Sequence, residues 1–389
     1  MTRSDTVVLV PADPSATSAP AAMVSRLTNG SQKAQSKLKH PQLLELRELL
    51  AAAVECAEAK RHPWSHADTA RLIQERFSVT LSPRSIPRVL HRMSDACLHG
   101  SGLSVFRNDF FALYKGDACK VVDLLPDNSV DCIVTSPPYY GQRDYQVPGQ
   151  IGLERHPQEY IDRLMDLFRR VKRLLKPTGS LWVNLGDTYW SGKGRPCGPD
   201  KKQRNRRFLR PQDRSGPRPL CAPKQQLLIP HRFAIAMQDD GWIVRNDNVW
   251  YKENPTPDPA RDRSASAHEY MFHFVQQRRY FYNFDAVAVP SDGDQHVKSP
   301  PSVWTLRSKP SFKKHIAVFP ESLVRIPVLA TLPPGGVILD PFCGSGTALG
   351  YAVGLGDGRR AIGIDISESA LAEATALMEA IRPVLPDRT

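Results

Sequence analysis

One stretch near the carboxyl end of this 389-residue chain limits what the chain can fold into. Residues 336–339 form an apolar run that ends at Asp340. A short loop with two glycines (PFCGSGT) follows, and a helical stretch after Gly346 leads to a second apolar run at Ala361–Ile364. A strand, a tight glycine loop, a helix and another strand are typical of a βαβ unit in a parallel sheet. We therefore expect an α/β domain with a mostly parallel sheet.

The glycine loop predicts a ligand. Gly344 and Gly346 let the backbone turn sharply and come close to a bound group, and the helix behind the loop begins with unpaired N–H groups. The spacing fails the GxGxxG dinucleotide fingerprint, and the loop lacks the GK[ST] ending of a P-loop. Asp365 ends the next strand, where a doubly wound fold places an acid that binds ribose hydroxyls. The loop favours a nucleoside-like ligand without a pyrophosphate over a purely structural turn.

The remaining pattern of residues 101–389 agrees with a doubly wound sheet, which has helices on both faces. Helical spacing and apolar runs predict strands at 111–117, 130–136 and 180–185, a turn at 176–179, and helices over 118–125, 160–175 and 367–381. We expect the last of these helices to be capped by Ser367.

A second motif, Thr135-Ser-Pro-Pro-Tyr-Tyr140, follows one of the predicted strands. Pro137 and Pro138 lack N–H donors and hold the chain extended. Ser136, the proline carbonyls and the ring of Tyr139 are expected to converge at the carboxyl edge of the sheet, where such folds bind ligands. This set suits a flat amino-heterocycle, because the oxygens accept hydrogen bonds from an exocyclic NH₂ group and the ring stacks on its face.

Together, TSPPYY, DPFCGSGT and the GIDIS that follows resemble the amino-methyltransferases of DNA, which use S-adenosylmethionine. The catalytic motif precedes the cofactor loop, as in the permuted β group of that family. The resemblance covers about residues 108–382. It implies a Rossmann-like fold with Ser136, Pro137, Pro138 and Tyr139 as the catalytic segment. The cofactor-binding residues that it implies are Asp117, Phe319, Asp340, Phe342, Gly344, Gly346, Thr347 and Asp365.

Within that family, a serine before Pro-Pro-Tyr resembles the cytosine-N4 enzymes, while Asp or Asn resembles the adenine-N6 enzymes. We therefore expect methylation of the exocyclic N4 of a flipped cytosine, with adenine N6 as the alternative. A carbon-5 cytosine enzyme needs a nucleophilic Cys after Pro, and the one such pair, Pro196-Cys197, follows no strand. Methylation of RNA or protein fits the motif order less well. A DNA-binding regulator with a degenerate methyltransferase body is a remoter alternative.

The N-terminal part of the chain differs in composition and in the pattern of its apolar residues. Residues 1–38 are polar and rich in Ser, Ala and Pro, which predicts a disordered tail. Residues 39–100 are helical, with Ser65 as an N-cap and Pro83 at the start of a third helix. This region is either a helix-turn-helix domain or a plain bundle packed on the main domain. In the first case the exposed residues of the recognition helix are Arg84, Ser85, Arg88 and Arg92.

The charge balance favours a polyanionic partner, since 52 Lys and Arg against 40 Asp and Glu give a net charge of +12. A basic insertion at 190–224 and a DNA-recognition segment at about 250–310 interrupt the sheet pattern. The expected DNA contacts are Arg143, Lys201, Lys202, Arg204, Arg206, Arg207, Arg261 and Arg263.

The expected partners are double-stranded DNA, a cognate restriction endonuclease and a second copy of the chain. Seven scattered Cys without C-x-x-C pairs predict neither a disulfide framework nor a metal site. No apolar run is long enough to span a membrane. We therefore expect a cytoplasmic protein of a bacterium or phage, associated with the nucleoid.

Overall fold

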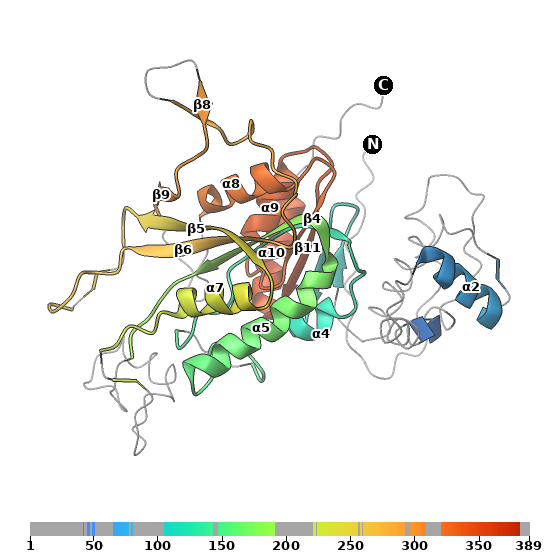
Figure 1. Cartoon of the computed structure of the whole chain (residues 1–389), viewed down its shortest axis with the longest axis horizontal. Helices are drawn as coiled ribbons and strands as arrows, with labels where there is room; N and C mark the ends of the chain where they lie inside the picture. The colour runs from blue at the N-terminus through green and yellow to red at the C-terminus, as the bar shows by residue number, and fades with distance from the viewer. Residues whose placement is uncertain are drawn as a thin grey trace. The chain divides into compact units, whose positions relative to one another are not determined.

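The computed structural model describes residues 42, 45–46, 49–50, 65–77, 79–80, 105–142, 147–190, 221–222, 224–255, 257–258, 260–291, 296–308 and 320–381. Figure 1 shows these residues in colour. They belong to two compact units: one holds the described residues before 81 and residues 123–126, and the other holds the rest. The expected tail at 1–38 and the third N-terminal helix lie outside the described residues.

The smaller unit contains helix α2, His66–Phe77. Ser65 precedes it, and the backbone N–H of Asp68 donates to the Ser65 hydroxyl at 3.3 Å while the N–H of Ser65 donates to the Asp68 carboxylate at 3.0 Å. These reciprocal bonds satisfy donors that the first turn of a helix leaves free. Ser65 therefore begins the helix as its sequence position predicted.

The larger unit is built on a nine-stranded sheet with the strand order β1-β2-β11-β10-β3-β4-β6-β5-β9. Its strands are β1 Val105–Arg107, β2 Phe111–Lys115, β3 Val130–Thr135, β4 Leu175–Leu185, β5 Ile243–Lys252, β6 His268–Val275, β9 Val303–Leu306, β10 Val337–Asp340 and β11 Arg360–Asp365. The central strands β2, β11, β10, β3 and β4 are parallel to one another, and β1 is antiparallel to β2. Strands β5 and β6 form an antiparallel hairpin beside β4. A separate ribbon pairs β7 Val289–Pro290 with β8 Val297–Lys298.

Helices cover both faces of this sheet (Figure 1). On one face lie α4 Ala118–Val122, α5 Pro157–Leu174 and α7 Ile229–Asp239, where Phe168 packs on Phe233 and Phe233 on Phe274. On the other lie α8 Glu321–Thr331, α9 Thr347–Gly354 and α10 Glu368–Ala380, whose buried side chains form one cluster with alternate residues of the strands. The expected doubly wound α/β fold is confirmed. None of the described helices is both long and apolar enough to cross a membrane.

The boundaries differ from expectation where proline or strand pairing intervenes. Strand β3 ends at Thr135, one residue early, because Ser136 precedes a proline that cannot donate to a ladder. Helix α4 ends at Val122 instead of 125, close to Pro126. The turn expected at 176–179 is a bulge inside β4, where the register shifts between Val130 and Cys132 of β3.

Candidate active site

The two sequence motifs meet at one edge of the sheet. Strand β3, which leads into the Ser-Pro-Pro-Tyr segment, lies directly beside β10, which leads into the glycine loop, and the two are parallel. The hydroxyl of Thr135 donates a hydrogen bond of 2.6 Å to Oδ1 of Asp340. Both motifs therefore leave the carboxyl ends of adjacent parallel strands, which is where ligands bind in open α/β sheets.

The glycine loop is held to the next strand by a carboxylate. The N–H of Gly344 donates to Oδ2 of Asp365 at 2.9 Å, and the N–H of Ser367 donates to Oδ1 at 2.8 Å. Gly344 has a φ of +51° and Gly346 a φ of +81°, in the left-handed region that favours glycine. At Gly346 an added Cβ would also lie 3.1 Å from the Cβ of Ala374. The sequence at these positions is therefore required by the backbone of the loop.

Two carboxyl groups, Asp340 buried and Asp365 half-buried, make this edge electronegative. Burial raises the pKa of Asp340 to about 7, against hydrogen bonds from Thr135 and Phe342 that lower it, and the charge of Asp365 raises it further. Burial likewise raises the pKa of Asp365. Among the described residues, neither carboxyl has a cationic partner, and both hydrogen bonds to Asp340 end on Oδ1. The pair suits a ligand that carries a positive charge and N–H donors.

Asp117 lies at the same edge, two residues after β2. The N–H of Gly116 donates to the carbonyl of Asp365 at 3.0 Å, so the two acids come from neighbouring strand ends. One oxygen of the Asp117 carboxylate accepts a hydrogen bond of 2.8 Å from the N–H of Cys119 and so caps α4. Phe342 and Thr347 belong to the loop and to the first turn of α9. Phe319 lies outside the described residues.

Tyr139 of the Ser-Pro-Pro-Tyr segment is fixed through its hydroxyl. That oxygen lies 2.5 Å from Oε2 of Glu269 and 3.0 Å from Oδ1 of Asn184. A Cβ on Gly186 would come within 2.8 Å of Cε2 of the tyrosine ring, so the ring packs on a residue that only glycine fits without a shift. Burial and the adjacent Glu269 carboxylate raise the pKa of the phenol well above its usual range. The ring is therefore held in one place before any ligand arrives.

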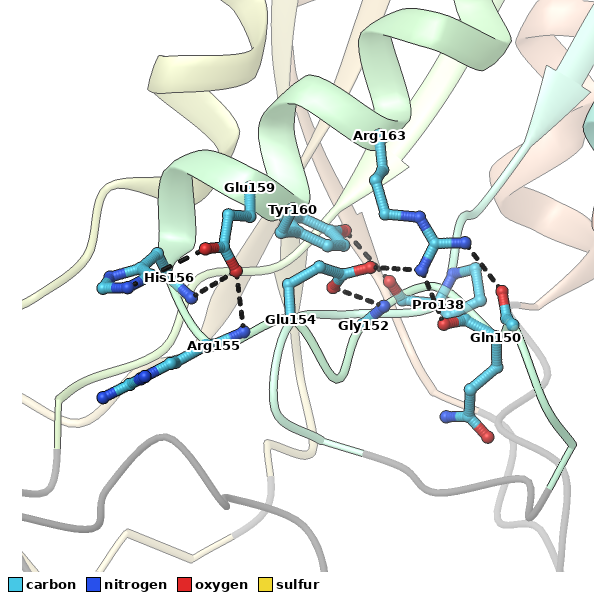
Figure 2. Close-up of polar contacts among 10 residues, drawn as sticks. Pro138, Gln150, Gly152, Glu154, Arg155, His156, Glu159, Tyr160 and Arg163 are labelled. Atoms are coloured by element: carbon cyan, nitrogen blue, oxygen red, sulfur yellow. Dashed lines mark hydrogen bonds and ion pairs between the residues drawn. The ribbon is translucent and has the colours of Figure 1, made fainter.

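Figure 2 shows how the chain after the prolines is clamped to α5. The buried Tyr160 hydroxyl donates to the carbonyl of Pro138 at 2.9 Å. Arg163 donates to the Glu154 carboxylate at 2.9 Å, and the same carboxylate accepts from the N–H of Gly152 at 2.8 Å. Gly152 has a φ of +103°, and an added Cβ would lie 3.0 Å from the carbonyl oxygen of Tyr139. These contacts fix the carbonyl of Pro138 against α5.

The described ends of the basic insertion pair with each other at the end of β4. Tyr189 and Gln226 form an antiparallel bridge, and the Asp187 carboxylate accepts from the N–H groups of Leu228 and Ile229, both at 3.0 Å. The residues that flank the insertion, 187–190 and 224–229, are therefore paired with each other where the chain leaves β4. We call these two flanking segments the neck. The insertion's expected DNA contacts, Lys201, Lys202, Arg204, Arg206 and Arg207, lie outside the described residues, and so does Arg143.

The two remaining expected DNA contacts have different surroundings. Arg263 is bonded to Asp258 at 2.7 Å, and its guanidinium lies 3.8 Å from the centre of the Tyr189 ring. Lys224 and Asp262, 2.5 Å apart, form a second link between the neck and the β5–β6 loop. Arg261 is exposed and has no hydrogen bond or ion pair to the described part of the chain. Arg263 therefore joins two segments, while Arg261 is an exposed charge without a partner in the described part of the chain.

Several side chains at this edge were not anticipated from the sequence. Asn184 lies in β4 and Asp187 follows it, and the carboxyl end of that strand was predicted at 185, so their place at this edge was available as a signal. Glu269 offers no such signal, because only the register of the antiparallel hairpin brings it to Tyr139. Tyr160 and Arg163 occur in the predicted helix, but their partners lie in a loop that has no periodic pattern.

Comparison with known proteins agrees with this geometry. A family model described as DNA methylase (N6_N4_Mtase) matches residues 130–376. The chain is 40% identical over 292 residues to the type II methyltransferase M.XycI of Xanthomonas campestris pv. cyanopsidis, which covers 74% of this chain and 90% of the relative. It is 41% identical over 255 residues to the type II methyltransferase M.SmaI of Serratia marcescens, with coverage of 65% and 85%.

A solved structure has the same fold. The PvuII DNA methyltransferase, whose description reads cytosine-N4-specific, matches with a TM-score of 0.51 and 19% identity, over 72% of this chain and 88% of that one. At that identity the likeness concerns the fold alone. The family model spans more than half of the chain, and M.XycI matches over most of its own length. The chain accordingly belongs to the N6/N4 family of DNA methylases.

Proposed function

We propose that this DNA methyltransferase transfers a methyl group from S-adenosylmethionine to the exocyclic N4 of a cytosine that has been flipped out of double-stranded DNA. The observation that carries the proposal is the Thr135–Asp340 hydrogen bond. It places the segment suited to an amino base beside the loop suited to a nucleoside. The donor supplies a methyl group on a positively charged sulfonium.

The residues of the glycine loop fit such a donor. Asp340 is buried and Asp365 half-buried, and neither carboxyl has a cationic partner among the described residues. They would face the amino and ribose groups of the ligand respectively. Gly344 has open space where a Cβ would be, so the loop presents backbone there. Phe342, Gly346, Thr347 and Asp117 complete the residues that we assign to the cofactor, and Phe319 stays a prediction.

The chemistry of the acceptor sets the task of Ser136 and Pro137. The lone pair of an exocyclic amine is delocalised into the ring, which makes the nitrogen a poor nucleophile. Hydrogen bonds from the NH₂ group to the Ser136 side chain and the Pro137 carbonyl would favour a pyramidal nitrogen whose lone pair points at the methyl group. The Pro138 carbonyl already accepts from Tyr160, which occupies one of its two lone pairs and makes it a weaker competitor for those protons. Positioning then supplies much of the acceleration.

Tyr139 would stack on the flipped base. A base inside a duplex cannot reach this edge of the sheet, so it must leave the stack, and an aromatic face compensates part of the lost stacking. The ring of Tyr139 is already held by Gly186 and by its hydroxyl contacts.

The choice of cytosine rests on Ser136 and agrees with the description of the PvuII enzyme. Methylation of adenine N6 is the alternative outcome of the test.

The likeness to type II methyltransferases supports a role in restriction-modification. A companion endonuclease, a homodimer, the cytoplasmic location and a DNA-reading role for residues 39–100 stay predictions. So do the DNA contacts of the basic insertion and the DNA-recognition segment at about 250–310. Light scattering of the purified protein, which measures its molar mass in solution, would test whether it forms a dimer.

The direct test supplies tritiated S-adenosylmethionine with unmethylated plasmid DNA, RNA or a protein mixture as acceptor. We expect tritium in DNA alone. Ser136→Ala should lower the transfer rate by roughly ten- to a hundred-fold, as loss of a hydrogen bond to a charge-developing group does, and leave cofactor affinity unchanged. Transfer to RNA or protein, or cofactor binding without any transfer, would overturn the proposal.

A further inference from the structure

The hydroxyl of Tyr139 has two oxygen acceptors but one proton to donate. Oε2 of Glu269 lies at 2.5 Å and Oδ1 of Asn184 at 3.0 Å. The Asn184 amide is oriented by its own N–H bond to the carbonyl of Tyr270 at 3.1 Å, so its oxygen faces the phenol. The carboxylate is closer and charged, and charge-assisted hydrogen bonds are about twice as strong as neutral ones. The Tyr139 hydroxyl therefore donates its hydrogen bond to Glu269.

Glu269 is itself fixed from the other side. Its Oε1 pairs with Nζ of Lys252 from the adjacent strand β5. The two side chains are only 13% and 24% exposed, so water screens the pair less than it would a surface pair. The Lys252 ammonium also lies 4.7 Å from the centre of the Trp250 ring. The Glu269 carboxylate is thus held by the hairpin and has one oxygen left for the tyrosine.

We infer that Glu269 is a positioning residue for methyl transfer, which sets the ring of Tyr139 for stacking on the target base, with Lys252 as its counter-ion. The inference rests on the proposed function, since it assigns the tyrosine ring to a flipped base. It goes beyond that function by adding the hairpin β5–β6 to the machinery. A ring fixed in advance costs no rotamer entropy when the base arrives. Without Glu269 the hydroxyl keeps only the longer contact with Asn184, so part of the ordering of the ring would fall on each turnover.

A double-mutant cycle separates this role from a general structural one. The rate of first-turnover tritium transfer to unmethylated plasmid DNA is measured for the wild type, Tyr139→Phe, Glu269→Ala and the double variant. Tyr139→Phe keeps the ring and removes only the hydroxyl. If Glu269 acts through that hydroxyl, Glu269→Ala should slow transfer roughly ten- to a hundred-fold in the wild type, but about twofold or less in Tyr139→Phe. Glu269→Gln, which keeps an acceptor, should recover part of the rate.

Two further variants serve as controls. Glu269→Ala/Lys252→Ala removes the unpaired ammonium that the single variant leaves, and it should show the same dependence on the Tyr139 hydroxyl. Glu379→Ala removes an exposed glutamate on α10 and should transfer at the wild-type rate. An equal loss from Glu269→Ala in both tyrosine backgrounds would overturn the inference. Absence of transfer by the wild type would instead overturn the proposed function and the inference with it.

A readout without turnover uses nitration of tyrosine by tetranitromethane, which attacks the phenolate. Glu269 and burial raise the pKa of Tyr139, so the wild type should react slowly there. In Glu269→Ala the site should react faster, because loss of the carboxylate lowers the pKa of the phenol. Tyr160 is an internal control, because its pKa is raised by burial and by Glu154 and not by Glu269. Faster nitration of both tyrosines would mean general loosening and would contradict a specific contact.

Discussion

The hydroxyl of Thr135 donates a hydrogen bond of 2.6 Å to the carboxyl of Asp340, joining two motifs that lie 205 residues apart in the chain. Both groups are buried, so the bond forms where water cannot replace it. It fixes the relative position of the segment assigned to the base and the loop assigned to the methyl donor.

Thr135→Val keeps the shape of the side chain and removes this bond. A buried carboxyl that loses a partner is destabilised, so we expect the free energy of unfolding to fall by about 1–3 kcal/mol. The affinity for S-adenosylmethionine should fall roughly tenfold by the same reasoning. Denaturant unfolding and calorimetric titration measure the two effects. Thr178→Val, at an exposed position of β4, is the matched control, and equal effects of both variants would refute the assignment.

The raised pKa of Asp340 predicts how ligand affinity depends on pH. The carboxyl is neutral below about pH 7 and ionised above it. A cationic donor prefers the ionised form, so its affinity should rise as the pH passes from 6 to 8. Asp340→Asn should bind more weakly and lose this rise. Titrations at fixed ionic strength test the point, and an affinity that is flat with pH in the wild type would contradict it.

The same shift predicts the stability of the ligand-free protein. The folded pKa of Asp340, about 7, exceeds the ordinary value of 3.8, so the folded state keeps a proton that the unfolded state releases. This contribution is fully present below pH 3.8 and is lost as the pH rises to about 7. Asp365 shifts in the same direction. Asp340→Asn should therefore unfold at a higher temperature than the wild type at pH 8. A lower unfolding temperature there would show that the carboxyl is not destabilised by burial.

Tyr160→Phe tests the clamp of Figure 2. The change removes the donor to the Pro138 carbonyl and leaves a part-buried acceptor unpaired, which should lower the free energy of unfolding by about 1–3 kcal/mol. Transfer should also slow, because the freed carbonyl competes for the amino group. Tyr251→Phe, on an exposed ring, should leave stability unchanged. A wild-type rate in Tyr160→Phe would show that the clamp does not position the prolines.

The two arginines of the β5–β6 loop should behave differently. If Arg261 meets a phosphate, Arg261→Ala should reduce the slope of log affinity against log salt by about 0.9. Arg263 is paired with Asp258 and stacked on Tyr189, so Arg263→Ala should lower the unfolding temperature and change the slope less. DNA binding from 50 to 200 mM salt measures both slopes. A larger change of slope in Arg263→Ala would assign that residue to the DNA instead.

The sequence was informative where chemistry depends on local backbone. Neighbouring residues explain the glycines of the loop, the prolines after β3 and the acids at strand ends. The ends of their strands were predicted to within two residues. Contacts between distant strands could not be predicted from the sequence. Glu269 reaches Tyr139 only through the pairing of β6 with β4, and Arg263 reaches Tyr189 through two loops that have no periodic pattern.

The measurement closest to the central claim identifies the product. Unmethylated DNA is incubated with the enzyme and labelled S-adenosylmethionine, digested to nucleosides and separated against standards. We predict that the label co-migrates with N4-methyldeoxycytidine and that Ser136→Ala abolishes most of it. Label in N6-methyldeoxyadenosine would contradict the assignment of the base, and an unlabelled digest would contradict the account as a whole.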